Sequence, residues 1–253
     1  MAYAPIPSPA REFAASRRLA ALADALDPQT FAALAALRGP APRLCLELGA
    51  GTGSVARRLA EQFPRARVVA TDLAAPPARS PLGNLEFVRH DVRCDGFRDG
   101  TFDLIHVRYL LCDLVERDRI LDDIASWLAP GGRLVVEEPD HSPVYDSPHR
   151  AYRTVTLAMV EAQHRYVGTD SLWARELPAH VAATGLTDIA THRTSTTVAA
   201  GSPMARYWRL SLAELRPLLP PGLDIPAALR EADSATFRDH GFTTVRVSAV
   251  RRG

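Results

Sequence analysis

Short apolar runs, each closed by a polar or charged residue, recur along the first half of the chain. They cover residues 44–47, 68–72, 85–89, 102–108 and 133–138. Runs of this length that are apolar almost throughout are typical of strands buried on both faces of a parallel sheet. Segments with helical periodicity separate them, among them 116–128, which ends at the breaker Ala129-Pro130-Gly131-Gly132. The alternation predicts an α/β fold with a mostly parallel sheet and helices on both faces.

The remaining segments predict further helices and two more strands. Two helices are expected between residues 11 and 38, the second with Asp27 as its N-cap and Pro28 at its first position. Proline-rich stretches such as 217–226 are expected to be loops within one domain. The other expected elements are helices at 147–167, at 172–184 and from 202 onward, and strands at 187–194 and 242–250.

The turn after the first apolar run reads Glu-Leu-Gly-Ala-Gly-Thr-Gly over residues 47–53. Glycines permit backbone conformations closed to other residues, and they let a ligand approach the main chain with no Cβ in the way. A strand that turns through such a loop into a helix is typical of a cofactor site. A dinucleotide fingerprint, G-x-G-x-x-G, would place its third glycine later than Gly53. This spacing disfavours a nicotinamide oxidoreductase.

Acidic residues also follow the second and third runs. Asp72 lies at the distance from the glycine turn where a ribose-binding carboxylate belongs, and Asp91 comes just after the third run. Open α/β sheets bind ligands at the carboxyl ends of their strands. The acids therefore support a cofactor site at this edge of the sheet.

Taken in order, these features resemble the motifs of class I S-adenosylmethionine-dependent methyltransferases. The resemblance is close over residues 43–140, and 102–140 is further similar to bacterial methyltransferases that act on small molecules. It implies a Rossmann-like, seven-stranded sheet in one domain, residues 1–253. The expected parts are an N-terminal helical lid (1–40), a cofactor-binding core (41–140) and helical insertions near the acceptor pocket (141–171 and 196–241).

The resemblance also implies the cofactor, S-adenosylmethionine, with S-adenosylhomocysteine as product. Glu47 and Asp72 are expected to bind its methionine and ribose portions, Asp91 and Val92 the adenine, and Leu73 is expected to pack against the base. The complete set of expected cofactor residues is Glu47, Gly49, Ala50, Gly51, Asp72, Leu73, Asp91, Val92 and Arg108.

The helical insertions supply the candidates for acceptor binding, which are Tyr145, Tyr152, Met204 and Trp208. An aromatic stripe at helical spacing is equally typical of a core, so both interpretations stay open. A hydroxyl acceptor benefits from a base with a pKa near neutrality, for which histidine suits best. The candidate bases are His141 and His149, with Asp113 at a position where several relatives have histidine. His106 lies inside an apolar run and is expected to be a packed core residue.

Charge and composition favour a small-molecule acceptor. The 30 basic and 29 acidic residues leave a net charge of +1, which predicts neither a nucleic-acid track nor a membrane surface. Every basic residue is arginine, which excludes a P-loop lysine and Schiff-base chemistry. No signal peptide or membrane-length run is present, so a cytoplasmic monomer or homodimer is expected. No carboxylate pair of the magnesium-binding type follows the fourth run, so no metal is expected.

The sequence thus predicts an enzyme that moves a methyl group to a small, secondary-metabolite acceptor, with oxygen as the acceptor atom and nitrogen or carbon as alternatives. One alternative function keeps the cofactor but uses the sulfonium charge to assist a rearrangement or cyclisation. Another is a non-catalytic interaction module that retains the fold.

Overall fold

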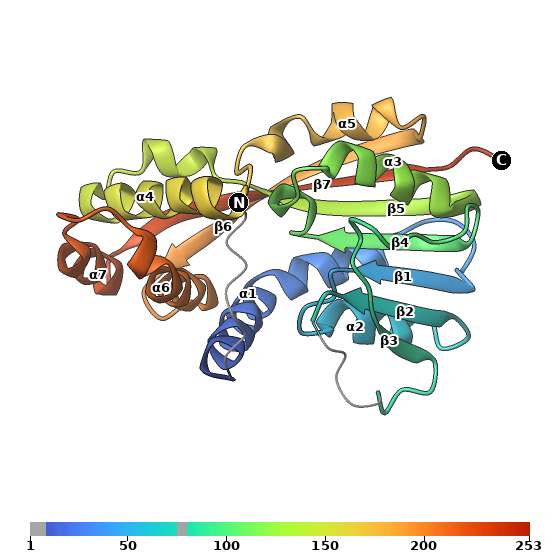
Figure 1. Cartoon of the computed structure of the whole chain (residues 1–253), viewed down its shortest axis with the longest axis horizontal. Coiled ribbons are helices and arrows are strands. Elements are labelled where there is room, and N and C mark those ends of the chain that lie inside the picture. The colour runs from blue at the N-terminus through green and yellow to red at the C-terminus, as the bar shows by residue number, and fades with distance from the viewer. Residues whose placement is uncertain (1–8, 75–79) are drawn as a thin grey trace. The chain divides into compact units, whose positions relative to one another are not determined.

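The computed structural model describes residues 9–74 and 80–253, with side chains from residue 16 onward. Its strands form one seven-stranded sheet in the order β3-β2-β1-β4-β5-β7-β6 (Figure 1). From β3 to β5, neighbouring strands pair in parallel, which confirms the predicted α/β fold and mostly parallel sheet. The strands are β1 (Leu44–Leu48), β2 (Arg67–Asp72), β3 (Leu85–Arg89), β4 (Phe102–Arg108), β5 (Leu128–Asp140), β6 (Thr187–Ala199) and β7 (Arg238–Val250).

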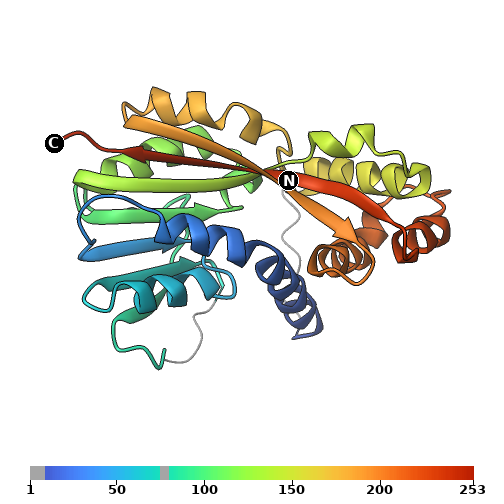
Figure 2. The ribbon, with the colours of Figure 1, turned by 180° about the vertical axis from the view of Figure 1, so that it is seen from behind.

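Seven α-helices accompany the sheet in the described part of the chain. Helix α2 packs on β1, β2 and β3, and it lies in front of these strands in Figure 2. None of the described helices combines the length and apolar character needed to cross a bilayer. The helices are α1 (Pro9–Ala35), α2 (Ser54–Gln62), α3 (Arg117–Trp127), α4 (Arg150–Val167), α5 (Leu177–Ala183), α6 (Pro203–Leu215) and α7 (Ile225–Asp233).

Contacts divide the chain into two compact units. In the first unit α4 packs against α6 and α7, and in the second α2 packs on the strands that lead to the glycine turn. The helical insertions expected after the fifth and sixth strands fall mainly in the first unit. The first unit comprises Met1–Leu26, Pro139–Trp173 and Arg193–Thr244, and the second comprises Asp27–Glu138, Ala174–His192 and Val245–Gly253.

Helix α1 is continuous, so the prediction of two helices that meet at Pro28 was wrong. Pro28 lies inside the helix, and Asp27 does not cap a new one. A proline inside a helix removes one backbone hydrogen bond and crowds the preceding turn. The Asp27 carboxylate instead accepts hydrogen bonds from Ser54 Oγ at 3.1 Å and from Arg108 Nη2 at 2.9 Å. These tertiary contacts favour a helix that passes through the proline.

The C-terminal elements differ in length from the prediction. Strands β6 and β7 have 13 residues each and extend beyond the expected 187–194 and 242–250. Helix α7 was missed because its start falls in a proline-rich stretch interpreted as a loop. Asp224 caps this helix by accepting the N–H of Ala227, and Pro226 lies in its first turn, where a missing N–H costs nothing.

Candidate functional site

The turn from β1 into α2 has a backbone that only glycine adopts readily. Gly49, Gly51 and Gly53 have φ of 67°, 52° and 73°. A Cβ at Gly53 would lie 2.7 Å from the ring of Phe87, closer than real Cβ contacts allow. Gly53 is also the N-cap of α2 and contributes no side chain to its first turn. The backbone N–H groups at the start of α2 are thus available to a ligand.

Asp72, at the end of β2, is fixed beside this turn. Its Oδ2 accepts the N–H of Gly51 at 2.8 Å, and its Oδ1 accepts the N–H of Ala74 at 3.0 Å. Each carboxylate oxygen keeps a second lone pair, so both can still accept a hydroxyl. The neighbouring Leu73 side chain is exposed and offers an apolar surface. A carboxylate and an apolar side chain thus lie together at the edge where a nucleoside is expected.

Asp91, which follows β3, is paired with Arg93. The carboxylate accepts from Arg93 Nε at 2.8 Å and from Nη2 at 2.6 Å, and these bonds lower the pKa of Asp91 to about 2. Val92 is buried beside it. The Asp91 carboxylate is therefore charged at neutral pH, and its contact with adenine stays a prediction.

A buried histidine connects the ends of three strands. Nδ1 of His106 lies 2.7 Å from Oε2 of Glu47, its register partner on β1, and Nε2 lies 3.6 Å from Oε2 of Glu137 on β5. All three side chains are at most 3% exposed. Burial lowers the pKa of His106, but the carboxylates of Glu47 and Glu137 outweigh it and raise the pKa to about 9. His106 is thus a cation held between two carboxylates.

The same network reaches α1. Glu137 Oε2 accepts a hydrogen bond from Thr30 Oγ1 at 2.5 Å, and Thr30 Oγ1 in turn accepts from Arg108 Nη1 at 3.1 Å. Burial raises the pKa of Glu137, yet the nearby His106 cation, the hydrogen bond from Thr30 and the charge of Arg108 prevail and lower the pKa to about 2. Arg108 is therefore bound to α1 through Thr30 and Asp27. Its predicted role toward the cofactor stays a prediction.

Glu138 holds the loop that follows β4. Its carboxylate accepts the backbone N–H groups of Leu110, Leu111 and Cys112 at 3.2, 2.8 and 3.3 Å. Burial raises the pKa of Glu138 to about 7, although these hydrogen bonds oppose the shift. Asp113, the third candidate base, is exposed at the end of this segment.

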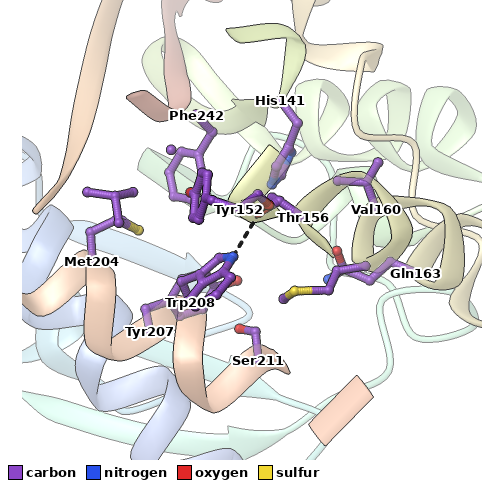
Figure 3. Close-up of a pocket in the computed structure, with 13 residues that line it drawn as sticks. His141, Tyr152, Thr156, Val160, Gln163, Met204, Tyr207, Trp208, Ser211 and Phe242 are labelled. Carbon is purple, nitrogen blue, oxygen red and sulfur yellow. Dashed lines mark hydrogen bonds between the residues drawn. The ribbon is translucent and has the colours of Figure 1, made fainter. Parts of the chain in front are cut away.

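The first unit contains a separate cavity between α4, α6 and the neighbouring parts of β6 and β7 (Figure 3). Counting its open mouth, it has ≈ 420 Å³ of unfilled space. The rings of Tyr152 and Trp208 lie 5.0 Å apart in its wall, and Trp208 Nε1 donates to Thr156 Oγ1 at 2.9 Å. Its aromatic and thioether side chains are those of Tyr152, Met159, Met204, Tyr207, Trp208 and Phe242.

The structure brings some of the predicted acceptor residues together and separates others. Tyr152, Met204 and Trp208 line the cavity, whereas Tyr145 is exposed and lies outside the lining. The sequence missed further lining residues, Thr156, Ser211 and Phe242, because their contribution depends on how α4, α6 and β7 pack. A polar residue on the apolar face of a helix is the signal that could have indicated Thr156 and Ser211.

The two histidine candidates occupy different environments. His141 lines the cavity, and burial lowers its pKa to about 4, so its imidazole is neutral at neutral pH. His149 lies outside the lining, where its Nε2 is 3.1 Å from the carbonyl oxygen of Arg238 and its ring packs on Phe237. Of the two, His141 is the one that lines this cavity.

Residues 9–74 and 80–253 contain no cluster of three or more His, Cys, Asp or Glu arranged to hold a metal ion. Independence from metal stays a prediction.

The chain matches one protein family and is similar in sequence to known methyltransferases. The family described as a methyltransferase domain matches residues 15–190, more than half of the chain. Methyltransferase str3 from Strobilurus tenacellus is 36% identical over 111 residues, which are 44% of this chain and 40% of that protein. Demethylmenaquinone methyltransferase from Thermus thermophilus is 34% identical over 105 residues, 39% of this chain and 48% of that protein. The chain thus spans less than half the length of these relatives.

Solved structures agree in fold. Human N-acetylserotonin methyltransferase in complex with S-adenosylmethionine superimposes with a TM-score of 0.57 and 14% sequence identity. The superposition covers 96% of this chain and 57% of that one. At this identity the likeness concerns the fold alone.

Proposed function

The chain belongs to the methyltransferase domain family, and from this premise we propose that it transfers a methyl group from S-adenosylmethionine to a small-molecule acceptor. The observation that carries the proposal is the contact between Asp72 and the glycine turn. A carboxylate held by the N–H of Gly51 lies beside a backbone that no Cβ obstructs. Such a seat suits a ribose and the chain attached to it.

The residues of the second unit fit this cofactor in charge and shape. Asp72 offers two oxygens to ribose hydroxyls, and exposed Leu73 offers an apolar surface to the base. Glu47 supplies a buried carboxylate for the cofactor's amino group, and His106 holds that carboxylate in place. Bound there, S-adenosylmethionine supplies a methyl group on a sulfonium, which needs no further activation.

For the acceptor we propose oxygen as the first atom to test, with nitrogen and carbon as the alternatives. Methyl transfer depends mainly on alignment of the acceptor atom and exclusion of water, and positioning alone contributes several kcal/mol. Neutral His141 accepts a hydrogen bond from an acceptor hydroxyl in this proposal and so orients the oxygen. With a pKa of about 4, His141 is a weak proton acceptor, and its part is orientation more than proton removal.

Calorimetric titration of the purified protein with S-adenosylhomocysteine tests the proposal, with NAD and NADP as controls. We expect saturable micromolar binding of S-adenosylhomocysteine and none of either dinucleotide. A methyl gain in acceptors, measured by mass spectrometry, then separates transfer from a rearrangement or cyclisation assisted by the sulfonium. Absence of S-adenosylhomocysteine binding by the folded protein would contradict the proposal and favour a non-catalytic interaction module.

A further inference from the structure

Two polar atoms in the lining of the first unit's cavity are buried and unpaired. Oγ of Ser211 and Nδ1 of His141 have no hydrogen-bond partner among the described residues. Ser211 is 6% exposed. Buried polar atoms are paired in nearly all native structures, so an unpaired one in a cavity wall points to a ligand that completes it.

The hydroxyl of Thr156, another polar group in the lining, is already hydrogen-bonded within the protein. Thr156 Oγ1 accepts from Trp208 Nε1 at 2.9 Å and donates to the backbone oxygen of Tyr152 at 2.7 Å. The hydroxyl of Thr156 thus uses one donor and one acceptor in the wall itself. Ser211 Oγ and His141 Nδ1, unlike the Thr156 hydroxyl, have no partner among the described residues. Figure 3 shows these two residues on opposite sides of the aromatic side chains.

The lining also lacks charge. None of the described residues that line the cavity is Asp, Glu or Arg. Burial lowers the pKa of His141 to about 4, so it contributes no charge near neutral pH. The nearby Arg18 contacts Tyr207 of the lining but is already paired with Glu214 at 2.7 Å. A carboxylate, phosphate or ammonium in this cavity would thus lose its hydration without gaining an unpaired counter-charge, which disfavours binding. The cavity therefore selects for an uncharged molecule.

The shape of the wall restricts the ligand further. Aromatic rings from α4, α6 and β7 line the cavity, with Tyr152 and Trp208 tilted by 40° to each other. Aromatic walls bind aromatic ligands by burying large flat surfaces and by edge-to-face contacts. Met159 and Met204 can adjust around such a ligand because thioether side chains are flexible.

We infer that the acceptor is an uncharged aromatic molecule, such as a phenol, whose oxygen substituents bind Ser211 Oγ and His141 Nδ1. This inference rests on the proposed function, because it specifies that function's acceptor. It assigns Ser211 and His141 as the residues that recognise polar substituents, and the rings of Tyr152, Trp208 and Phe242 as the surfaces that bind the aromatic body.

Three probes that share one ring system test the inference. They are 2-naphthol, naphthalene and 2-naphthoate, titrated into the full chain by calorimetry and followed by tryptophan fluorescence. We expect 2-naphthol to bind at least about 10-fold more tightly than 2-naphthoate, because the carboxylate has no counter-charge in the cavity. The single hydroxyl of 2-naphthol can bind either Ser211 or His141, so Ser211→Ala or His141→Phe should weaken 2-naphthol binding about 3- to 10-fold. Ser211→Ala should leave naphthalene binding unchanged, because naphthalene has no hydrogen bond to lose. Ser234→Ala, in an exposed turn, is the matched control.

Equal or tighter binding of 2-naphthoate overturns the inference. So does unchanged 2-naphthol affinity in both Ser211→Ala and His141→Phe, and so does the absence of saturable binding by all three probes. Titration of the same preparations with S-adenosylhomocysteine keeps the two proposals apart. If the probes behave as expected and S-adenosylhomocysteine does not bind, the cofactor proposal fails while the cavity's ligand class stands. If S-adenosylhomocysteine binds but the probes do not behave as expected, the cofactor proposal stands and only the inferred class of acceptor fails.

Discussion

Nδ1 of His106 lies 2.7 Å from Oε2 of Glu47, and the two residues are register partners on β4 and β1. The two side chains are 0% and 3% exposed, so the pair is shielded from bulk solvent. Nε2 of His106 faces a second carboxylate, that of Glu137. His106 therefore places one positive charge between two buried carboxylates and fixes Glu47, the one that we propose contacts the cofactor.

Removal of this cation should destabilise the fold. His106→Ala leaves Glu47 buried without a counter-charge, whereas Glu137 keeps its ion pair with Arg246 at 3.4 Å. Breaking a buried pair by removing one partner costs about 3–5 kcal/mol. Urea unfolding at neutral pH measures the loss. His192→Ala is the control, since His192 is exposed, and it should change stability by less than about 0.5 kcal/mol. Equal effects of the two substitutions would show that His106 carries no structural charge.

The same pair predicts how stability depends on pH. The pKa of His106 is raised from 6.5 to about 9, so its contribution is fully present below pH 6.5 and is lost as the pH rises to about 9. The free energy of unfolding of the wild type should fall across that window. His106→Gln, which cannot titrate, should show a flatter profile there. A slope that persists unchanged in His106→Gln would assign the titration to another group.

Glu138 should control the order of the loop after β4. Glu138→Ala removes the acceptor of the three N–H groups at residues 110–112, and it should lower stability by about 2–4 kcal/mol. Hydrogen exchange of those three amides should speed up markedly, while the amides of β1 change only as global stability does. Preserved protection at residues 110–112 would mean that the loop holds its own shape.

The strands could be predicted because their pattern is local. Each apolar run is closed by a charged residue, and a strand buried on both faces needs no other signal. The helix through Pro28 could not be predicted, because its local signal favours a break. Asp27 forms contacts with Ser54 and Arg108, residues far along the chain, and these override the local preference.

The buried network and the full lining of the cavity could not be predicted from the sequence, for a related reason. His106 and Glu47 are 59 positions apart and meet because β4 lies next to β1 in the sheet. Strand order depends on the crossover connections, which the apolar pattern does not encode. Trp208 and Thr156 are likewise 52 positions apart. The sequence grouped Tyr152, Met204 and Trp208, which line one cavity, but it did not identify the other lining residues Thr156, Ser211 and Phe242.

Gly53 should be irreplaceable at the glycine turn. Gly53→Ala has two costs: a left-handed φ of 73°, and a Cβ placed 2.7 Å from Phe87. Gly100→Ala is the matched control, because Gly100 has a φ of 69° and open space around its Cβ. The control should lose about 1–2 kcal/mol from backbone strain alone, whereas Gly53→Ala should lose more. S-adenosylhomocysteine affinity should fall only in Gly53→Ala, and equal losses of affinity would mean that the turn does not contact the cofactor.

The role of Asp72 can be tested by comparison with Asp103, a carboxylate that also accepts two backbone N–H groups but lies where the strand β1 begins. Asp103 Oδ2 accepts the backbone N–H groups of Arg43 at 2.7 Å and Leu44 at 3.0 Å, where β1 begins. Asp72 accepts those of Gly51 and Ala74, where β2 ends.

Alanine substitution of Asp72 or Asp103 leaves two N–H groups without their acceptor, so both variants should lose about 1–3 kcal/mol of stability. Only Asp72→Ala also removes a ribose contact, because open α/β sheets bind ligands at the carboxyl ends of their strands. Its affinity for S-adenosylhomocysteine, measured calorimetrically, should fall at least several-fold while that of Asp103→Ala stays within about 2-fold of wild type. Unchanged affinity in a folded Asp72→Ala protein would move the ribose site away from β2.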